Sequence, residues 1–323
     1  MINKFYIGVD GGGTYTRVAV VSEVGELILH ECGGTINFNA VGFDTARKNF
    51  EDAFDKIISK ISTDNIARVF IGCSALDTRA DIETTKRLMG KYSFLKADMD
   101  SDLYVALFGH TFGEKGAMLI SGTGSMGIAV SEGGKLFTCG GWGYAVGDEG
   151  SAYHIATEGL RAAVKMADGR AEVSALYYAM LDHYGIDDPH TLAEKLYQPY
   201  LSRDKIASFA RVVSDCAKKG DPTALSILDL AASELAQLAS ALLRKSGISD
   251  SIAVYGGVLQ NNGYVLSQLK KNLCREFSGI RVLFPRALPE FGAAAAAINE
   301  DGALTEECIK KICSINQKSE DQK

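Results

Sequence analysis

Residues 7–22 read IGVDGGGTYTRVAVVS, and this stretch decides the fold. An apolar run ends at Asp10, glycines occupy positions 11–13, and a valine-rich run begins at Arg17. β-Branched residues favour strands, whereas consecutive glycines favour a tight turn between strands. The stretch therefore predicts a β-hairpin with a glycine-rich turn at its tip.

The same pattern recurs at residues 119–130, which read LISGTGSMGIAV. Apolar runs predict further strands at 67–75 and 251–258, and helical periodicity predicts helices between strands, such as 43–61. Strands that alternate with helices are typical of the α/β class with a mixed sheet. Two hairpins of similar build suggest a duplicated domain plan.

A chain of 323 residues exceeds what one hydrophobic core usually supports, so two domains are expected. We predict a first domain over residues 1–116 and a second over 117–298. A tail over 299–323 follows, and it can pack back on the first domain. Its last residues, QKSEDQK, have the composition of a frayed, solvated end.

The composition is that of an ordinary globular protein, with 46% apolar residues, 23% charged residues and a net charge of −6. Basic residues are dispersed, so neither nucleic acid nor a membrane surface is an expected partner. No signal peptide and no run of about 18 apolar residues is visible, which favours a cytoplasmic protein. The seven cysteines are scattered without a CxxC pair, and we expect free thiols.

The first glycine turn has the composition of an anion-binding loop. Two glycines suffice for a turn, and the surplus lets the amides of Gly12 and Gly13 approach phosphate oxygens, with the Thr14 hydroxyl as a further donor. Asp10 beside phosphates is placed to hold Mg²⁺ through water. The alternative is a plain hairpin turn. No GxxxxGK[ST] loop is present, and the Rossmann fingerprint fails because the glycines lead into a strand.

Two later turns extend this pattern. Thr123 stands between Gly122 and Gly124, which supplies amide and hydroxyl donors without competing charge. Gly256 and Gly257 follow another apolar strand and leave room for a flat group such as adenine with its ribose. A polar hairpin and an ordinary strand-to-helix turn are the alternatives. Together the three turns predict a nucleotide site.

In this order and spacing, the three motifs resemble the phosphate-1, phosphate-2 and adenosine motifs of the sugar kinase, actin and heat-shock ATPase superfamily. Within it, the chain resembles the N-acetylglucosamine kinase branch of the BadF/BadG/BcrA/BcrD ATPase family. The resemblance covers residues 5–298, and its most specific piece is GGWGYAVGDEGSAY at 140–153. It implies an α/β fold of two ribonuclease-H-like domains with mixed sheets that close over a cleft, with ATP and Mg²⁺ as cofactors.

The resemblance also implies roles for individual residues. It assigns the hydrated Mg²⁺ to Asp10, the phosphates to Gly12, Gly13, Thr14, Thr123 and Gly124, the adenosine to Gly256 and Gly257, and the sugar to Asn37, Gly141, Trp142, Gly143 and Asp148. Asn39 is an alternative to Asn37, and Glu149 ranks behind Asp148. His154 is interpreted as a packed or surface histidine.

A base within hydrogen-bond reach of the sugar hydroxyl is needed to take its proton during phosphorylation. The family carries an aspartate at a helix N-terminus, and the segment SDLYVAL (101–107) aligns Asp102 with it. Ser101 is the expected N-cap, and the helix dipole favours the ionised carboxylate. Asp98 and Asp100 are close rivals. Asp102 is therefore the predicted catalytic base and a predicted sugar contact.

Two departures from the family pattern leave the choice of sugar open. Tyr15 stands where many relatives have lysine, so cationic help to the phosphates is absent there or comes from Arg17. The segment GCSALDTRAD (72–81) also lacks the usual small residues, which leaves one wall of the sugar pocket unassigned.

The resemblance predicts an ATP-dependent kinase that phosphorylates the 6-hydroxyl of an N-acetylated amino sugar. N-acetylglucosamine is the first candidate, with N-acetylmuramic acid and glucosamine as alternatives. A second class, an ATPase activator of a radical dehydratase or reductase, would need an iron–sulfur cluster held by cysteines and a DIGGQD-like segment, which this sequence lacks. A sugar-sensing protein with an inactive site is a third reading. Family habit suggests a homodimer.

Overall fold

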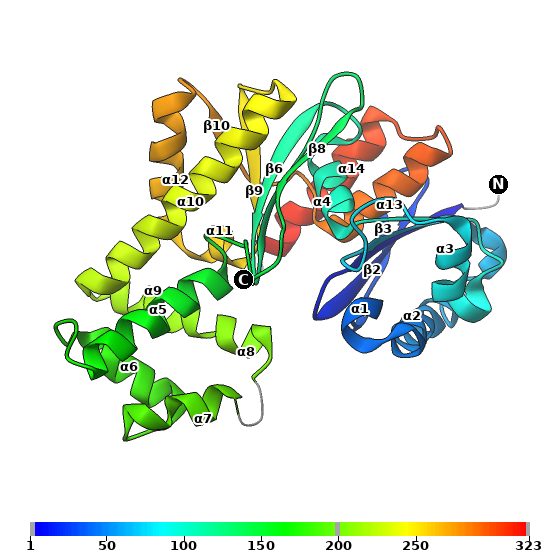
Figure 1. Cartoon of the computed structure of the whole chain (residues 1–323). Coiled ribbons are helices and arrows are strands. Elements are labelled where there is room, and N and C mark those ends of the chain that lie inside the picture. Colours follow the sequence, from blue (N-terminus) through cyan, green and yellow to red (C-terminus); the bar gives the residue numbers. More distant parts are fainter. Residues whose placement is uncertain (1–3, 198–200, 321–323) are drawn as a thin grey trace. The chain divides into compact units, whose positions relative to one another are not determined.

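The computed structural model describes residues 4–197 and 201–320, with side chains up to residue 315. The chain forms two compact units, each built around one sheet (Figure 1). The first comprises Met1–Lys115 and Pro285–Lys323, and the second is the continuous segment Gly116–Phe284. The first unit is thus completed by chain that follows the second.

The first unit is a five-stranded sheet with helices on both faces. Its strands are β1 (Phe5–Gly11), β2 (Tyr15–Ser22), β3 (Leu27–Gly34), β4 (Ile66–Cys73) and β5 (Ala97–Asp100). Its helices are α1 (Phe38–Val41), α2 (Phe43–Ile58), α3 (Ile82–Met89), α4 (Asp102–Thr111), α13 (Pro289–Glu300) and α14 (Glu306–Glu320). The sheet order is β3-β2-β1-β4-β5. The β1–β2 and β2–β3 pairs are antiparallel, and the β1–β4 and β4–β5 pairs are parallel.

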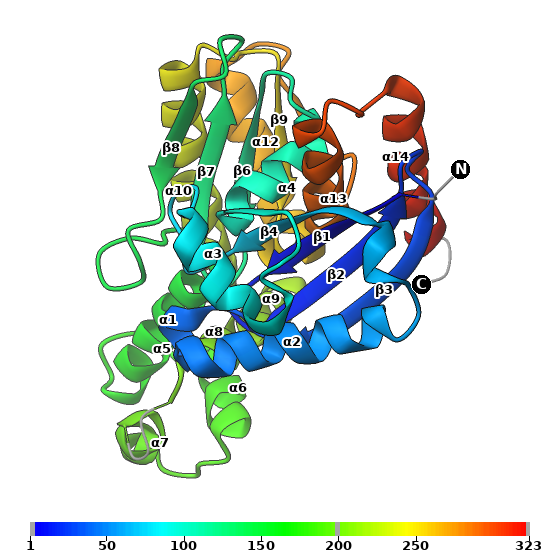
Figure 2. The same ribbon diagram turned by 90° about the vertical axis from the view of Figure 1, so that its right-hand side faces the viewer.

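Both faces of this first sheet are covered, because alternate side chains of each strand point to opposite sides. Ile7 and Val9 pack with Phe50 of α2 on one face. Tyr6 and Phe70 pack with α13 and α4 on the other. Helices α2 and α13 accordingly lie on opposite sides of β1 and β2 (Figure 2). Burial on both faces explains the near-continuous apolar run of β1.

Helix α13 approaches β1 and α4 so closely that small residues are required. A Cβ on Gly8 would overlap the backbone carbonyl of Glu290, and a Cβ on Gly292 would overlap the carbonyl of Val105. The alanines 293–297 are all buried. The run FGAAAAA therefore follows from close packing and not from helix propensity alone.

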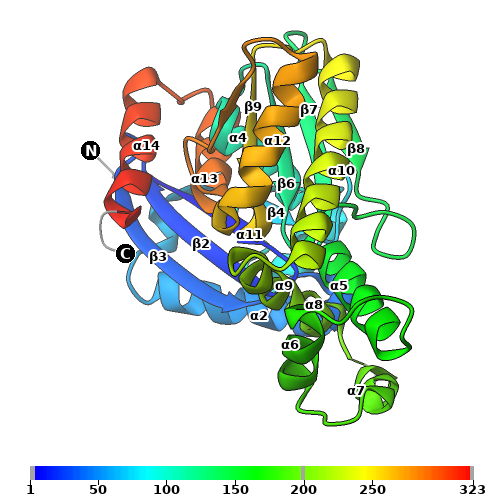
Figure 3. The same cartoon turned by 90° about the vertical axis from the view of Figure 1, so that its left-hand side faces the viewer.

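The second unit repeats the plan with a larger set of helices. Its strands are β6 (Gly116–Ser121), β7 (Ser125–Val130), β8 (Leu136–Gly140), β9 (Ser251–Tyr255) and β10 (Arg281–Leu283). Its helices are α5 (Ala152–Ala167), α6 (Ala175–Tyr184), α7 (Leu192–Tyr197), α8 (Arg203–Ala207), α9 (Phe209–Lys218), α10 (Pro222–Ser246), α11 (Gly257–Asn261) and α12 (Gly263–Glu276). Helices α10 and α12 run side by side along the sheet (Figure 3).

The two sheets share one topology. The order β10-β9-β6-β7-β8 is that of the first sheet written in reverse, with β6 in the place of β1. Strands β6, β7 and β8 are antiparallel neighbours, and β9 is parallel to β6, as β4 is to β1. The duplicated α/β plan that the two glycine hairpins predict is confirmed at the level of strand order.

The predicted extent of the second domain, 117–298, is wrong at its end, because the chain from Pro285 onward packs in the first unit. Phe291 and the alanines of α13 bury against Phe70 of the first sheet, a long-range contact that no local pattern reveals. Helix α14 packs there too, through Cys308 and other apolar residues. Within the predicted frayed end, α14 continues to Glu320, and residues 321–323 lie outside the described residues.

Among the described residues, α10 is the single helix that is long and apolar enough to cross a membrane by length and composition. Its buried side chains include Leu228, Leu235 and Leu242, which belong to the core shared with the second sheet. The helix is therefore explained as the core helix of the second unit.

Candidate active site

The glycine turn between β1 and β2 keeps an open surface. A Cβ on Gly13 would meet no atom within 4 Å, and a Cβ on Gly12 would meet only a backbone oxygen at 3.5 Å. Neither residue has a positive φ, so neither packing nor backbone conformation demands glycine there. Gly11, in contrast, has no room for a side chain beside Ile36. With the exposed Thr14 next to it, the open pair suits a loop whose amides approach a ligand.

Asp10 is a buried carboxylate in an acidic setting. It is 6% exposed, and burial raises its pKa to about 7, with the carboxylates of Glu290 and Asp102 adding to the rise. Arg17 opposes this rise, with Nη1 lying 3.4 Å from Asp10 Oδ2. A carboxyl group whose pKa is close to 7 and which lies near two further acids would be stabilised in its ionised form by a bound cation.

Glu290, in the first turn of α13, is a candidate that the sequence did not reveal. The residue is 1% exposed, its Oε1 lies 3.0 Å from His30 Nε2, and its Oε2 is buried without a hydrogen-bond partner among the described residues. A single acid after a proline is ordinarily a first-turn charge that complements the helix dipole. Only the fold shows that this one is close enough to Asp10 to raise its pKa.

Asp102 begins α4, and Ser101 caps this helix as predicted, its Oγ accepting a hydrogen bond from Tyr104 N at 3.1 Å. Burial raises the pKa of Asp102 to about 6, and the backbone N–H groups of Leu103 and of Asp102 itself offset part of the rise. The sequence suggested that the helix N-terminus keeps Asp102 ionised, but burial has the larger effect on its pKa. A carboxylate with a pKa just below neutrality is suited to general-base catalysis.

The two rival aspartates are engaged elsewhere. Asp98 is held by two arginines, one of them Arg79 with an N–O distance of 2.5 Å. Asp100 Oδ1 accepts a hydrogen bond from Ser101 N at 2.6 Å, and burial raises the pKa of Asp100. The geometry of the first unit thus favours Asp102 over both rivals.

Asn37 caps the short helix α1. Its Oδ1 accepts hydrogen bonds from Asn39 N and Ala40 N, each at 3.0 Å, and its Nδ2 donates to Ser74 Oγ at 2.9 Å. The side chain of the alternative, Asn39, donates to Ala75 O at 3.1 Å. Because both lone pairs of Oδ1 are used, the predicted sugar contact of Asn37 depends on its second amide hydrogen.

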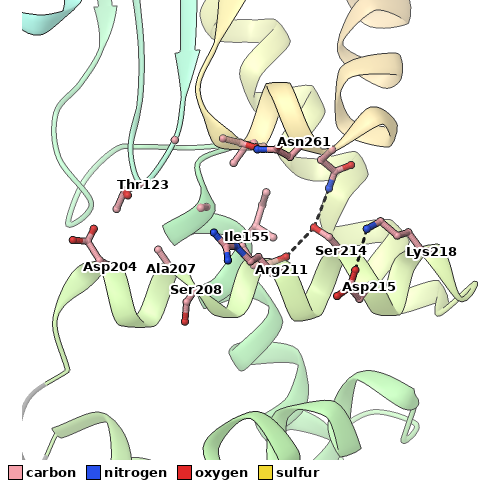
Figure 4. A pocket seen from close by; sticks show the side chains of 16 residues that line it. Thr123, Ile155, Asp204, Ala207, Ser208, Arg211, Ser214, Asp215, Lys218 and Asn261 are labelled. Atoms are coloured by element: carbon pink, nitrogen blue, oxygen red, sulfur yellow. Dashed lines mark hydrogen bonds and ion pairs between the residues drawn. The ribbon is translucent and has the colours of Figure 1, made fainter. Parts of the chain in front are cut away.

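A cavity of about 770 Å³ in the second unit brings two predicted motifs together (Figure 4). Gly122 and Thr123 reach it from the β6–β7 turn, and Gly257 and Asn261 reach it from α11. This volume lies in the range of ligand pockets that hold a nucleoside-sized group. The phosphate-2 and adenosine motifs, far apart in sequence, therefore line one cavity.

Two glycines of this cavity leave space for a ligand. A Cβ on Gly122 would meet no atom within 4 Å, and a Cβ on Gly257 would meet only Asn261 Nδ2 at 3.9 Å. Neither has a positive φ. As at the first turn, no packing reason explains the missing side chain.

Gly256 is required by the fold itself, and Gly124 by the ion pair beside it. Gly256 has a φ of +96°, and a Cβ there would lie 2.5 Å from Ser121 O. A Cβ on Gly124 would overlap the guanidinium of Arg203 and crowd the carboxylate of Asp148. Their predicted contacts with a nucleotide stay predictions, whereas their structural role is clear.

The segment 140–153 contains an exposed loop ahead of α5. Gly141 and Gly143 have φ angles of 75° and 83°, which favour glycine, and Trp142 between them is 79% exposed. Among described residues, His154 Nδ1 accepts a hydrogen bond from Gly150 N at 3.2 Å, which gives this histidine a local structural role. Trp142 is thus available to contact a ligand, and its sugar contact stays a prediction.

Asp148 is engaged inside its own unit. It is 4% exposed and has a φ of 62°, which is uncommon for a residue other than glycine. Its Oδ1 accepts a hydrogen bond from Ser125 N at 3.2 Å, and its Oδ2 lies 2.5 Å from Arg203 Nη2. A sugar hydroxyl would have to share these oxygens. Arg203, like Glu290, was not identified from the sequence.

Helices α8 and α9 form a wall of the cavity that local sequence patterns do not reveal. Asp204, Ser208, Arg211 and Lys218 recur at helical spacing and line the cavity, while Phe209 and its neighbours on the opposite face are buried. Their amphipathic pattern was visible, but a polar helical face is ordinarily interpreted as solvent-facing.

Mg²⁺ is implied by the family resemblance, and the first unit fits an ion held mostly by water. Within residues 4–197 and 201–315, no three histidine, cysteine, aspartate or glutamate side chains converge to hold a metal directly. Mg²⁺ keeps several waters and takes one or two carboxylates. Asp10 is a candidate for this role, and so is Glu290 through Oε2, which has no hydrogen-bond partner among the described residues. The seven cysteines are free thiols, as expected.

Two sheets of one topology, each with a glycine turn between its first two antiparallel strands, define a protein with the actin-like ATPase fold. Residues 7–297 match the BadF/BadG/BcrA/BcrD ATPase family, and the chain belongs to this family. The predicted family and fold class are confirmed.

Three similar proteins illustrate the family. An N-acetylmuramic acid/N-acetylglucosamine kinase of Clostridium acetobutylicum is 27% identical over 92% of this chain and 99% of its own length. An N-acetyl-D-glucosamine kinase of Dictyostelium discoideum is 26% identical over 93% and 99%. A crystal structure from Chromobacterium violaceum, assigned as an N-acetylglucosamine kinase, has a TM-score of 0.74 at 24% identity and covers 90% of this chain and 98% of that one.

Proposed function

We propose that this chain is an ATP-dependent kinase that phosphorylates the 6-hydroxyl of an N-acetylated amino sugar, with N-acetylglucosamine as its first substrate. The observation that carries the proposal is Asp102, a carboxyl group at a helix N-terminus with a pKa of about 6 and no arginine or lysine among the groups that shift it. Its rivals are already engaged. The relatives' names support the sugar, and family membership supports the use of ATP.

In the proposed reaction, Asp102 accepts the proton of the 6-hydroxyl while the hydroxyl oxygen bonds to the γ-phosphorus. The bond from the γ-phosphorus to the β–γ bridging oxygen breaks, and ADP leaves. Amides of Gly12 and Gly13 bind the phosphates, and the cavity beside Thr123 holds the nucleoside. Bound Mg²⁺ would neutralise part of the phosphate charge.

The proposal is tested by ADP release from purified protein with MgATP and a panel of sugars. The panel contains N-acetylglucosamine, N-acetylmuramic acid, glucosamine and glucose. We expect stimulation by the N-acetylated sugars and a product phosphorylated at the 6-hydroxyl, identified by NMR. If none of the four sugars stimulates ADP release, the proposal of a sugar kinase is refuted. Stimulation by glucosamine or N-acetylmuramic acid alone would keep the reaction and change the substrate.

A homodimer and a cytoplasmic location are further parts of the proposal, and both rest on family habit and on the sequence. Light scattering, which measures the mass of the protein in solution, tests the homodimer. We expect twice the chain mass of 34.6 kDa.

A further inference from the structure

Arg203 lies at the edge of the cavity, beside the phosphate-2 loop. It begins α8, and its neighbour Asp204 lines the cavity. On the other side, the guanidinium occupies the space that a side chain on Gly124 would need, and the preceding residue, Thr123, lines the cavity as well. Arg203 does not line the cavity itself, but on two separate chain segments it lies next to a residue that does, Asp204 on one and Thr123 on the other.

Asp148 fixes the position of this guanidinium. Its Oδ2 lies 2.5 Å from Arg203 Nη2, and its Oδ1 accepts the backbone N–H of Ser125 at 3.2 Å. One buried carboxylate thus ties the arginine to the loop that carries Thr123 and Gly124. The guanidinium carbon also lies 5.4 Å from the centre of the Tyr144 ring, which supports it from a further direction.

Arg203 retains donor capacity after these contacts. A guanidinium has five N–H donors, and the Asp148 contact engages Nη2. Its Nε is buried and has no hydrogen-bond partner among the described residues. The side chain as a whole is 35% exposed, so part of it is open to a ligand. An anionic group that reaches the guanidinium would accept charge-assisted hydrogen bonds from it.

The cavity shows which part of a nucleotide this edge would meet. Thr123 and Asp204 lie together at one end, whereas Lys218 and Asn261 lie toward the other (Figure 4). Thr123 belongs to the turn whose amides and hydroxyls suit phosphate, and Asn261 belongs to the helix of the adenosine motif. A nucleotide with its base near α11 would direct its phosphates toward Arg203.

On the basis of the nucleotide site in the proposed function, we propose that Arg203 binds the polyphosphate of ATP and that Asp148 is the residue that positions it. Arginine suits this role because its planar donors match phosphate oxygens in pairs. It supplies a cation in a chain that has tyrosine after its phosphate-1 threonine. Asp148 then acts through Arg203, which accounts for its burial and its two occupied oxygens.

The test measures binding of adenosine, ADP and ATP by calorimetry to the full-length chain, without sugar. Arg203→Ala should weaken ATP binding by about tenfold or more, the loss expected for a charge-assisted hydrogen bond, and adenosine binding by less than about twofold. Arg203→Lys should fall between wild type and alanine, because the charge stays and the paired geometry is lost. Asp148→Asn should weaken ATP more than adenosine.

Lys205→Ala is the matched control, because Lys205 is an exposed cation on the same short helix. It should leave all three affinities unchanged, which separates a local contact from general loss of positive charge. Equal losses for adenosine and ATP in Arg203→Ala, or no loss, would overturn the inference while wild-type ATP binding still supports the proposed function. If Arg203→Ala does not fold, the test uses Arg203→Lys and compares its loss of ATP affinity with its loss of adenosine affinity. Wild type that fails to bind ATP would overturn both proposals.

Discussion

The β1–β2 turn and the β6–β7 turn occupy the same place in two sheets of one topology, yet different kinds of polar groups surround them. The first turn is accompanied by three carboxylates, those of Asp10, Asp102 and Glu290. The second is accompanied by serine and threonine hydroxyls and by Arg203, whose charge Asp148 balances. The same fold thus carries two different groups of side chains. The carboxylates of the first unit suit cation binding and proton transfer, and the hydrogen-bond donors of the second unit suit phosphate binding.

The largest effect should come from the acidic side. Asp102→Asn should lower sugar-dependent ADP release by about 10²- to 10⁴-fold, the range for loss of a general base, while ATP binding is retained. In wild type, kcat/KM should rise with pH and level off above the Asp102 pKa of about 6, because the base must be ionised. Asp44→Asn, at the first turn of α2, is the control for changing a helix-terminal charge. Near-normal turnover in Asp102→Asn would remove this residue as the base.

Asp10 tests whether the acidic set carries strain when no cation is bound. Its pKa of about 7, against 3.8 for the ordinary group, means that the folded state holds its proton more tightly than the unfolded chain. Without Mg²⁺, the free energy of unfolding should therefore fall as pH rises from 3.8 to about 7. The loss amounts to at most about 4 kcal/mol. In Asp10→Asn the share of this loss that Asp10 causes should vanish, while a share from Asp102, whose pKa is also raised, remains. Urea unfolding across this pH range measures the difference, and equal slopes in both proteins would contradict the prediction.

In the second unit, the neighbouring glycines of the predicted adenosine motif should respond differently to alanine. Gly256→Ala forces a side chain into a φ of +96° against Ser121 O and should cost about 1–3 kcal/mol of stability. Gly257→Ala places its Cβ in open space, so stability should stay within about 0.5 kcal/mol while ATP binds more weakly. Thermal unfolding and calorimetry on both variants separate fold from ligand. Unchanged ATP affinity in Gly257→Ala would argue against ligand contact at α11.

The smallest effect concerns Asn37, on the acidic side. Asn37→Ala removes the cap of α1 and should cost about 1 kcal/mol. Asn37→Asp keeps the accepting oxygen but loses the amide hydrogens, so stability should be nearly retained. If Asn37 also contacts the sugar, Asn37→Asp should raise the sugar KM with little change in the ATP KM. An unchanged sugar KM would reduce Asn37 to a capping residue.

Local patterns were sufficient to predict much of the fold. The glycine hairpins, the cap at Ser101 and the start of α4 at Asp102 depend on residues close in sequence. The roles of Glu290 and Arg203 depend on contacts that cross the chain, to His30 in one case and to Asp148 in the other. Sequence spacing carries no information on such pairs, so both residues were missed.

The same limit explains the open glycines. The run GGGT announces a loop, but only the space around each Cα separates Gly11, which packing requires, from Gly12 and Gly13, which it does not. The polar face of α8 and α9 is likewise visible as a sequence pattern, but only the folded structure shows that this face lines a cavity.

The return of the chain to the first unit at Pro285 has a consequence for the order of folding. The second unit is continuous, so its core can close as soon as its own residues leave the ribosome. The first sheet cannot cover Tyr6 and Phe70 until α13 has been synthesised, because that helix supplies the Gly292 and alanine surface packed against them. A nascent chain stopped at Phe284 would expose an apolar sheet face, a state prone to aggregation. The last helices of this protein therefore complete the unit that is synthesised first.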